Sequence, residues 1–271
     1  MKYYVVPGEL SARSNKPGKV ETLVYETKAY ENDERKLTKK AYVYLPYDYD
    51  ESKTYPLMIL VHGGGGNETE WLLDHSDNKI MLDNMMAKGI SEEAIVVTPT
   101  FYPRDKAMTY LEGRYHPAAF HREVINDLLP AIEKKYSVSK DRENRAFAGL
   151  SMGSMTTYWS GISHMMDLFS WFGPYSGCAG PDSIAEENAQ KILDAIDVKF
   201  KDYSINYMFC CNGTKDIAHD EHVDTMKIVA DKSAKLTEGV NYEFIDVPNA
   251  EHNWEAWHFA LYHTMTKFFK K

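Results

Sequence analysis

Apolar residues follow two different patterns along the chain from about residue 20 onward. Apolar and polar residues alternate over 20–27 and 40–46, which predicts two antiparallel strands that each have one solvated face. A charged loop around residues 32–35 joins them. Continuous apolar runs at 55–61, 94–101, 146–150, 206–214 and 241–248 instead predict strands that are buried on both faces, as in a parallel sheet.

Helical spacing of apolar residues fills most of the gaps between these runs. It indicates helices near 81–86 and over 120–136, 184–196, 220–236 and 254–269, and Pro130 is expected to bend or restart the second of them. Strand and helix therefore alternate along the chain. This order predicts an α/β fold with a doubly wound, mostly parallel sheet, right-handed crossovers and antiparallel N-terminal strands.

The domain organisation follows from length and local composition. Residues 1–18 are rich in Gly, Pro, Ser and Lys and are interpreted as an N-terminal arm with little structure of its own. A chain of 271 residues with 44% apolar residues can bury the core of one α/β domain. We therefore expect one domain over 19–271.

A candidate nucleophile stands where the run 146–150 ends. Gly149-Leu150-Ser151-Met152-Gly153 fits the G-x-S-x-G elbow, a sharp strand-to-helix turn that presents a serine above a sheet. The two glycines remove side chains that would collide in so tight a turn. The pattern occurs by chance in long chains, so its weight depends on what the other strand ends carry.

Two further strand ends carry an acid and a base in the order that this fold uses, which is serine, acid, histidine. Asp216 follows the run 206–214, and His252 follows the run 241–248. Ser151 needs a base within hydrogen-bond reach, which His252 supplies, and Asp216 fixes the imidazole tautomer. The backbone N–H of Met152 and that of Gly63 or Gly64 are the expected oxyanion donors, each worth about 3–4 kcal/mol of barrier.

The sequence also allows other interpretations of these residues. Acids that could replace Asp216 are Asp220, Glu221, Asp224 and Asp246. His258 and His263 are expected to be packing or surface residues, and His62 to hold the oxyanion loop by a hydrogen bond. The run Gly63–Gly66 lacks the Lys-Ser/Thr of a phosphate loop.

No metal site is expected from the sequence. His219-Asp220-Glu221-His222 has metal-like spacing, but a solvated acidic first turn of a helix explains it. The three cysteines, Cys178, Cys210 and Cys211, form neither a disulfide framework nor a metal motif and are interpreted as buried thiols.

Charge and hydropathy exclude two classes of partner. The formal net charge of −9, without a long basic stretch, argues against nucleic acid and against an anionic membrane surface. No apolar run approaches the length needed to span a bilayer. The N-terminus has no apolar core for a signal peptide, so we expect either a cytoplasmic protein or a domain excised from a secreted bacterial enzyme.

Several of these segments together resemble the carbohydrate esterase family 1 feruloyl esterases, especially the esterase domains attached to cellulosomal xylanases. The similar segments are YLPY at 44–47, HGGG at 62–65, VVTPTF at 96–101, GLSMG at 149–153, GTKDIA at 213–218 and HNW at 252–254. The nucleophile, acid and base of that family fall on Ser151, Asp216 and His252. The resemblance spans the chain from about Val20 onward.

The resemblance implies hydrolysis of ferulate and p-coumarate esters on arabinoxylan or its oligosaccharides, without a metal or an organic cofactor. Trp254, Tyr175 and Phe101 are candidates for contact with the flat acyl group because aromatic rings stack on one another. The loop 102–115 is expected to face the substrate. An acetylxylan or other small-acyl esterase, an acyltransferase and a non-catalytic carbohydrate-binding module are the alternatives. The sequence does not indicate an oligomeric state.

Overall fold

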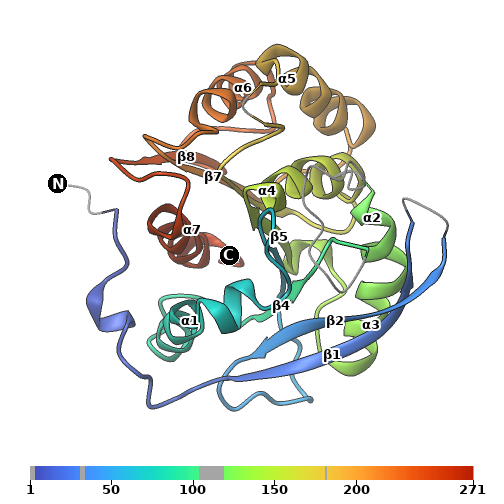
Figure 1. Ribbon diagram of the computed structural model, residues 1–271, viewed down its shortest axis with the longest axis vertical. Coiled ribbons are helices and arrows are strands. Elements are labelled where there is room, and N and C mark those ends of the chain that lie inside the picture. The colour runs from blue at the N-terminus through green and yellow to red at the C-terminus, as the bar shows by residue number, and fades with distance from the viewer. Residues whose placement is uncertain (1–3, 31–33, 104–118, 181, 271) are drawn as a thin grey trace.

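An eight-stranded sheet forms the centre of the computed structural model (Figure 1). The structure describes residues 4–30, 34–103, 119–180 and 182–270. The strands are β1 (Lys19–Lys28), β2 (Lys36–Leu45), β3 (Leu57–Val61), β4 (Ile95–Pro99), β5 (Arg145–Leu150), β6 (Trp171–Tyr175), β7 (Tyr207–Gly213) and β8 (Tyr242–Val247). Their spatial order is β1-β2-β4-β3-β5-β6-β7-β8. β2 runs antiparallel to both of its neighbours, and every pair from β4 to β8 is parallel.

Helices cover both faces of this sheet. The helices are α1 (Asp77–Ala87), α2 (Phe120–Glu123), α3 (Leu129–Lys135), α4 (Met152–Thr156), α5 (Ala185–Leu193), α6 (His219–Lys232) and α7 (Trp254–Lys267). Figure 1 shows α1 and α7 on one side of the sheet and the other helices on the opposite side. The molecule is therefore a three-layer α/β sandwich, and the predicted fold class is confirmed. None of the helices in the described part of the chain is both long and apolar enough to cross a membrane.

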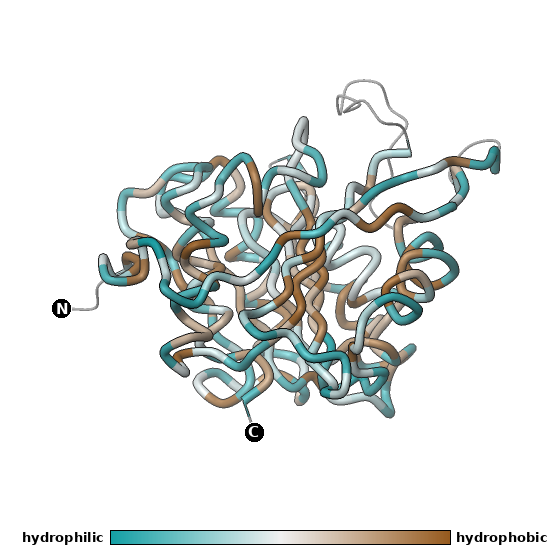
Figure 2. Tube along the Cα trace, turned by 90° about the horizontal axis from the view of Figure 1, so that it is seen from below, coloured by the Kyte–Doolittle hydropathy of each residue, from teal (hydrophilic) through white to brown (hydrophobic). Residues whose placement is uncertain are grey.

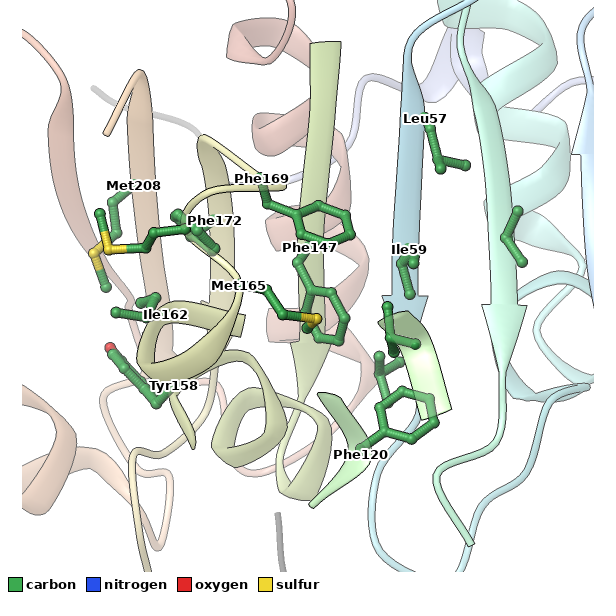
Figure 3. Close-up of a cluster of buried hydrophobic side chains, with 14 of the residues drawn as sticks. Leu57, Ile59, Phe120, Phe147, Tyr158, Ile162, Met165, Phe169, Phe172 and Met208 are labelled. Atoms are coloured by element: carbon green, nitrogen blue, oxygen red, sulfur yellow. The ribbon is translucent and has the colours of Figure 1, made fainter. Parts of the chain in front are cut away.

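The central strands supply side chains to both layers, as continuous apolar runs predict. In β3, Leu57, Ile59 and Val61 pack into the core under α2–α6, whereas Met58 and Leu60 pack into the core under α1 and α7. Figure 2 shows these strands as the apolar centre of the molecule. Figure 3 shows Phe147 of β5 beside Phe169 and Met165 in the first of the two cores. Because the central strands are buried on both faces, the positions of their ends are well defined.

The described part of the N-terminal arm, residues 4–18, packs along α1. Its structure is one short turn, Gly8–Leu10, whose Leu10 is fully buried. The side-chain amide of Asn84 donates to the carbonyls of Leu10 and Ala12, and Gly18 N–H donates to Asp83. The division into an arm at 1–18 and one domain at 19–271 stays a prediction.

The elements match the expected ones within a few residues, with local differences in two of the helices: the helix expected over 184–196 ends in a wider turn at Asp194–Lys199. The helix expected over 120–136 contains a wider turn at Val124–Leu128, directly before Pro130. Proline has no N–H to donate to the carbonyl four residues earlier, which accounts for the wider turn. Half of the expected charged loop at 32–35 and most of the expected substrate-facing loop at 102–115 lie outside the described residues.

Candidate active site

Ser151 occupies a strained turn between β5 and α4. Its φ is +54° and its ψ −117°, a conformation that a residue with a side chain rarely adopts. A Cβ at Gly149 would lie 2.7 Å from the backbone of Gly153, and one at Gly153 would lie 2.5 Å from the carbonyl oxygen of Val61. Only glycine therefore fits at both positions, and the turn has the geometry of a nucleophile elbow.

The structure brings Ser151, His252 and Asp216 together. The Oγ atom of Ser151 lies 2.9 Å from Nε2 of His252, and Nδ1 of His252 lies 2.7 Å from Oδ1 of Asp216. Asp216 follows β7 and His252 follows β8, so all three side chains meet at the carboxyl edge of the parallel strands. Because Asp216 accepts from Nδ1–H, Nε2 is left unprotonated and can accept the proton of the serine hydroxyl.

Ser176 and Trp257, which the sequence did not identify, support the Asp216 carboxylate, the first directly and the second through Ser176. The Ser176 hydroxyl donates to Oδ2 at 2.6 Å, and the indole N–H of Trp257 donates to the Ser176 oxygen at 2.8 Å. The backbone N–H of Ala218 donates to Oδ1 at 2.9 Å. Burial alone would raise the pKa of Asp216, but the hydrogen bonds from His252, Ser176 and Ala218 outweigh it and hold this pKa below its usual value. The only sequence signal for Ser176 is its place after a strand.

Hydrogen bonding within the glycine loop distinguishes the two candidate oxyanion donors. Gly63 N–H donates to the Glu70 carboxylate at 2.9 Å, whereas Gly64 N–H has no acceptor among the described residues. A Cβ at Gly64 would lie 2.9 Å from the sulfur of Met152, so this part of the loop adjoins the first residue of α4. The N–H of Met152 begins that helix and has no intrahelical acceptor. Gly64 and Met152 are therefore the better pair of donors.

His62 holds this loop from behind, as expected. Its Nδ1–H donates to the carbonyl of Gly63 at 2.7 Å, and its Nε2 accepts from the Thr100 hydroxyl at 2.8 Å. Phe101 stacks on the His62 ring with the ring centroids 4.2 Å apart, and its side chain is only 4% exposed. The prediction that Phe101 contacts substrate is corrected, because its ring packs behind the loop.

The other two aromatic candidates also lie outside the cleft at Ser151. The side chain of Tyr175 is fully buried between β6 and α7, and its hydroxyl is 2.6 Å from that of Thr264 in α7. Alternation along β6 directs its side chain into the core, so its predicted contact with substrate is wrong. Trp254 stacks on His75 and lines a separate hollow of about 430 Å³ beside the N-terminal arm. It does not line the cleft at Ser151.

A cleft of about 440 Å³ opens beside Ser151 and His252. Its apolar lining comes from Met155, Ala179, Ile217 and Ala218, and its polar lining includes Ser176, Asp182 and Ser183. Ile217 is 71% exposed directly after the acid, so an apolar side chain is available to a ligand at that point. Two larger hollows lie at the opposite ends of the strands, away from Ser151.

The second half of the cluster with metal-like spacing, Glu221 and His222, is part of the core, whereas Asp220 is solvated, so the interpretation as a solvated turn is corrected for Glu221 and His222. The Glu221 carboxylate accepts from the backbone N–H groups of Cys178 and Ala179 and from the Asn188 amide, all at 3.1 Å. His222 is fully buried, with Nε2 2.7 Å from the Tyr158 hydroxyl. In the part of the chain that the structure describes, no three His, Cys, Asp or Glu side chains form a group able to hold a metal.

The rival acids and histidines have other partners. Asp220 and Asp246 both lie beside His219, with Asp246 at 3.3 Å from its Nε2. Asp224 is exposed on α6. On α7, Nδ1 of His258 lies 2.7 Å from the Asn78 oxygen, and Nε2 of His263 lies 2.7 Å from Glu243. Neither ring reaches Ser151, in line with the expected packing or surface roles.

We expect His222 to make the fold sensitive to acid. Burial lowers the pKa of His222 from 6.5 to about 3. As the pH falls from about 6.5 to 3, the unfolded chain binds a proton at this site while the folded chain does not, so stability is lost with falling pH. In His222→Gln, the slope of unfolding free energy against pH should be smaller by about 1.4 kcal/mol per pH unit between pH 6 and 4. Urea denaturation at four pH values measures it.

His219→Gln is the matched control for that slope. Burial lowers the pKa of His219, but the carboxylates of Asp220 and Asp246 outweigh burial and raise it above 6.5. The stabilisation from His219 is therefore complete below pH 6.5 and is lost as the pH rises through the raised pKa. The control should keep the acid slope of the wild type. Equal acid slopes in the wild type and His222→Gln would contradict the assignment of a neutral His222.

Comparison with known proteins identifies the family. The family described as "Putative esterase" matches residues 35–268. Endo-1,4-beta-xylanase Y of Acetivibrio thermocellus is 30% identical over 247 residues, which are 86% of this chain and 22% of that protein. An endo-1,4-beta-xylanase/feruloyl esterase of Xylanibacter ruminicola is 31% identical over 214 residues, 76% of this chain and 27% of that protein. The chain thus spans about a quarter of the length of these relatives.

Solved structures show the same fold. A mutant feruloyl esterase module from Clostridium thermocellum, complexed with sinapinate, superposes with a TM-score of 0.83 at 25% identity, covering 99% of this chain and 94% of that one. A CE1 ferulic acid esterase from Anaeromyces mucronatus, in complex with ferulic acid, gives 0.79 at 22% identity, covering 99% and 98%. The fold is that of an α/β-hydrolase. The chain belongs to the esterase family and is a carboxylic ester hydrolase.

Proposed function

We propose that this protein is a serine esterase that hydrolyses hydroxycinnamoyl esters, of the ferulate and p-coumarate type, on arabinoxylan or its oligosaccharides. The observation that carries the proposal is the partly apolar cleft into which Ser151 and His252 both open. A flat aromatic acyl group has the shape and the apolar surface that such a cleft accommodates. The similar module that is complexed with sinapinate, a hydroxycinnamate, supports the same substrate class.

The proposed reaction has two half-reactions that pass through similar intermediates. The Oγ of Ser151 attacks the ester carbonyl while Nε2 of His252 takes its proton, and the oxyanion that forms accepts hydrogen bonds from Met152 and Gly64. The bond between the acyl carbon and the sugar oxygen breaks as His252 returns the proton to the leaving alcohol. Water, deprotonated by His252, then attacks the acyl-serine, and His252 returns this proton to Oγ of Ser151 as the carboxylic acid is released. Asp216 stabilises the imidazolium in both half-reactions.

A variant of the cleft tests the acyl specificity. We expect wild type to cleave a feruloylated arabino-xylo-oligosaccharide efficiently, and Ile217→Ala to lower kcat/KM for this substrate by about tenfold, the loss of one apolar contact of 1–2 kcal/mol. The same variant should leave hydrolysis of 4-nitrophenyl acetate within twofold of wild type, because an acetyl group has too little apolar surface to depend on the lining of the cleft. Since Ile217 is 71% exposed, the change should not affect folding.

Ile184→Ala is the matched control, because Ile184 is 55% exposed and does not line the cleft. It should keep wild-type rates on both substrates. If the wild-type protein cleaves 4-nitrophenyl acetate but not the feruloyl substrate, the protein is a small-acyl esterase. Activity on neither ester would instead favour the transferase or the carbohydrate-binding alternative.

A further inference from the structure

The N–H groups of the glycine loop are almost all occupied. Gly63 N–H donates to Glu70, Gly65 N–H donates to the Tyr102 hydroxyl at 3.0 Å, and Gly66 N–H donates to the Gly63 carbonyl at 3.2 Å. Gly64 N–H is the one without an acceptor among the described residues. The loop therefore exposes one donor, and it does so beside Met152.

Glu70 fills the space inside this turn. A Cβ at Gly66 would lie 2.5 Å from one carboxylate oxygen of Glu70 and 3.0 Å from the other. The carboxylate thus accepts from the N–H of Gly63 and occupies the space that a side chain at position 66 would take. Glu70 itself is held by its neighbour, because the indole N–H of Trp71 donates to the carbonyl of Val61 at the end of β3. A side chain fixed in this way can hold the loop in one conformation.

A partly buried carboxylate at this position needs an explanation. Burial raises the pKa of Glu70 above its usual value, and the hydrogen bond from Gly63 only partly offsets this. Desolvation of a carboxylate costs free energy, and a negative charge near an oxyanion site opposes catalysis. We expect a carboxylate with both disadvantages only where the loop conformation that it imposes is needed for function.

We propose that Glu70 is a positioning residue for the oxyanion hole: by accepting the N–H of Gly63 it orients the next peptide, so that Gly64 N–H is directed at the oxyanion together with Met152 N–H. The inference rests on the proposed acyl-enzyme reaction. It assigns to Glu70 a role that acts only through the loop, since the carboxylate itself contacts neither Ser151 nor His252.

Two substitutions of Glu70 distinguish the effect of losing the hydrogen-bond acceptor from the effect of losing the negative charge. Glu70→Ala removes the acceptor, and we expect kcat to fall by about 10- to 100-fold, which is less than the loss of about 10²- to 10³-fold that removal of a whole oxyanion donor causes. KM should change less than threefold, because the donor acts on the transition state. Glu70→Gln retains an oxygen that accepts from Gly63 N–H, so kcat should stay within threefold of wild type. Asp74→Asn removes an exposed carboxylate one turn away and is the matched control.

A double-mutant cycle of Glu70 and Gly66 tests whether the Glu70 carboxylate must occupy the space beside Gly66. Gly66→Ala places a methyl group where the Glu70 carboxylate lies, so it should displace Glu70 and lower kcat in the same way. In the Glu70→Ala background that space is empty, and Gly66→Ala should then cost less than twofold. This lack of additivity is specific to the proposed contact. Circular dichroism and thermal melts establish that each variant is folded.

The assays use both 4-nitrophenyl acetate and the feruloylated oligosaccharide, because every ester passes through the same oxyanion hole. Equal losses on both substrates support the inference. A folded Glu70→Ala with wild-type kcat would overturn it, as would additive effects of the two changes or a Glu70→Gln as slow as Glu70→Ala. If Glu70→Ala does not fold, Gly66→Ala and Glu70→Gln decide the question. Wild-type activity on acetate alone refutes the feruloyl proposal and leaves the Glu70 test intact.

Discussion

Replacing Ser151 by alanine is expected to lower kcat for both the feruloyl and the acetyl ester by about 10⁵- to 10⁶-fold, the scale at which loss of a nucleophile leaves only binding and oxyanion stabilisation. The reason is geometric: Ser151 Oγ is the hydroxyl that lies 2.9 Å from Nε2 of His252 at the mouth of the cleft. A neighbouring water cannot substitute for it without losing the covalent acyl intermediate. Single-turnover kinetics with the feruloylated substrate measures the residual rate.

The variant should still fold and still bind. Ser151 contributes its strained backbone to the elbow, and alanine accepts that backbone about as well as serine, so the melting temperature should change by only a few degrees. The control is Ser163→Ala, whose hydroxyl donates to the carbonyl of Tyr158 away from the cleft. Activity in Ser151→Ala above one per cent of wild type would refute the serine mechanism.

The sequence predicts the fold well because parallel strands have a strong signature. A strand such as β3 is buried on both faces, so its apolar run is continuous, and its end is marked by the glycines that follow. The order of serine, acid and histidine at three strand ends then locates Ser151, Asp216 and His252. Their roles in catalysis stay predictions until the variants are measured.

The residues that the sequence did not locate correctly depend on side-chain direction. Tyr175 stands at a strand end, like the catalytic candidates, yet the alternation of β6 directs it into the core against Phe209. In a strand buried on both faces no polar residue marks which way a side chain points. Trp254 and Phe101 likewise stand next to site residues in sequence but contact His75 and His62.

The residues that support the site could not be identified from the sequence for a different reason. Glu70 reaches the site through the backbone N–H of Gly63, seven residues earlier, and Trp257 reaches it through the hydroxyl of Ser176, which is remote in sequence. Such contacts have no characteristic spacing. Glu221 and His222 illustrate the same limit, because an acidic first helical turn looks solvated until the loop that covers it is placed.

Asp216→Asn is expected to lower kcat by about 10⁴-fold while leaving KM almost unchanged, because asparagine either changes the tautomer of His252 or removes the negative charge that stabilises its imidazolium. Asp216 accepts three hydrogen bonds, from His252, Ser176 and Ala218. An asparagine has one acceptor oxygen and an NH₂ group that can only donate. Kinetics on both esters, with a melt of each variant, measures the effect.

The orientation of the asparagine determines how the activity is lost. If its oxygen stays toward Ala218 and His252, the NH₂ group faces the Ser176 hydroxyl, which can rotate to accept because it has lone pairs. If instead the NH₂ group faces His252, Nδ1 becomes an acceptor, the proton moves to Nε2, and the base can no longer take the proton of Ser151. The first orientation retains the tautomer but loses the negative charge that stabilises the imidazolium.

Asp246→Asn is the matched control, since Asp246 is the rival acid on the neighbouring strand and lies beside His219 rather than His252. It should keep kcat within threefold of wild type. The opposite result, a folded Asp216→Asn within tenfold of wild type and a large loss in Asp246→Asn, would transfer the role of the acid to Asp246. Because hydrogen bonds hold the pKa of Asp216 below its usual value, the carboxylate is already ionised at every pH above about 5. Its protonation therefore cannot set the lower limit of the pH–rate profile in that range, and any limb seen there must come from another group.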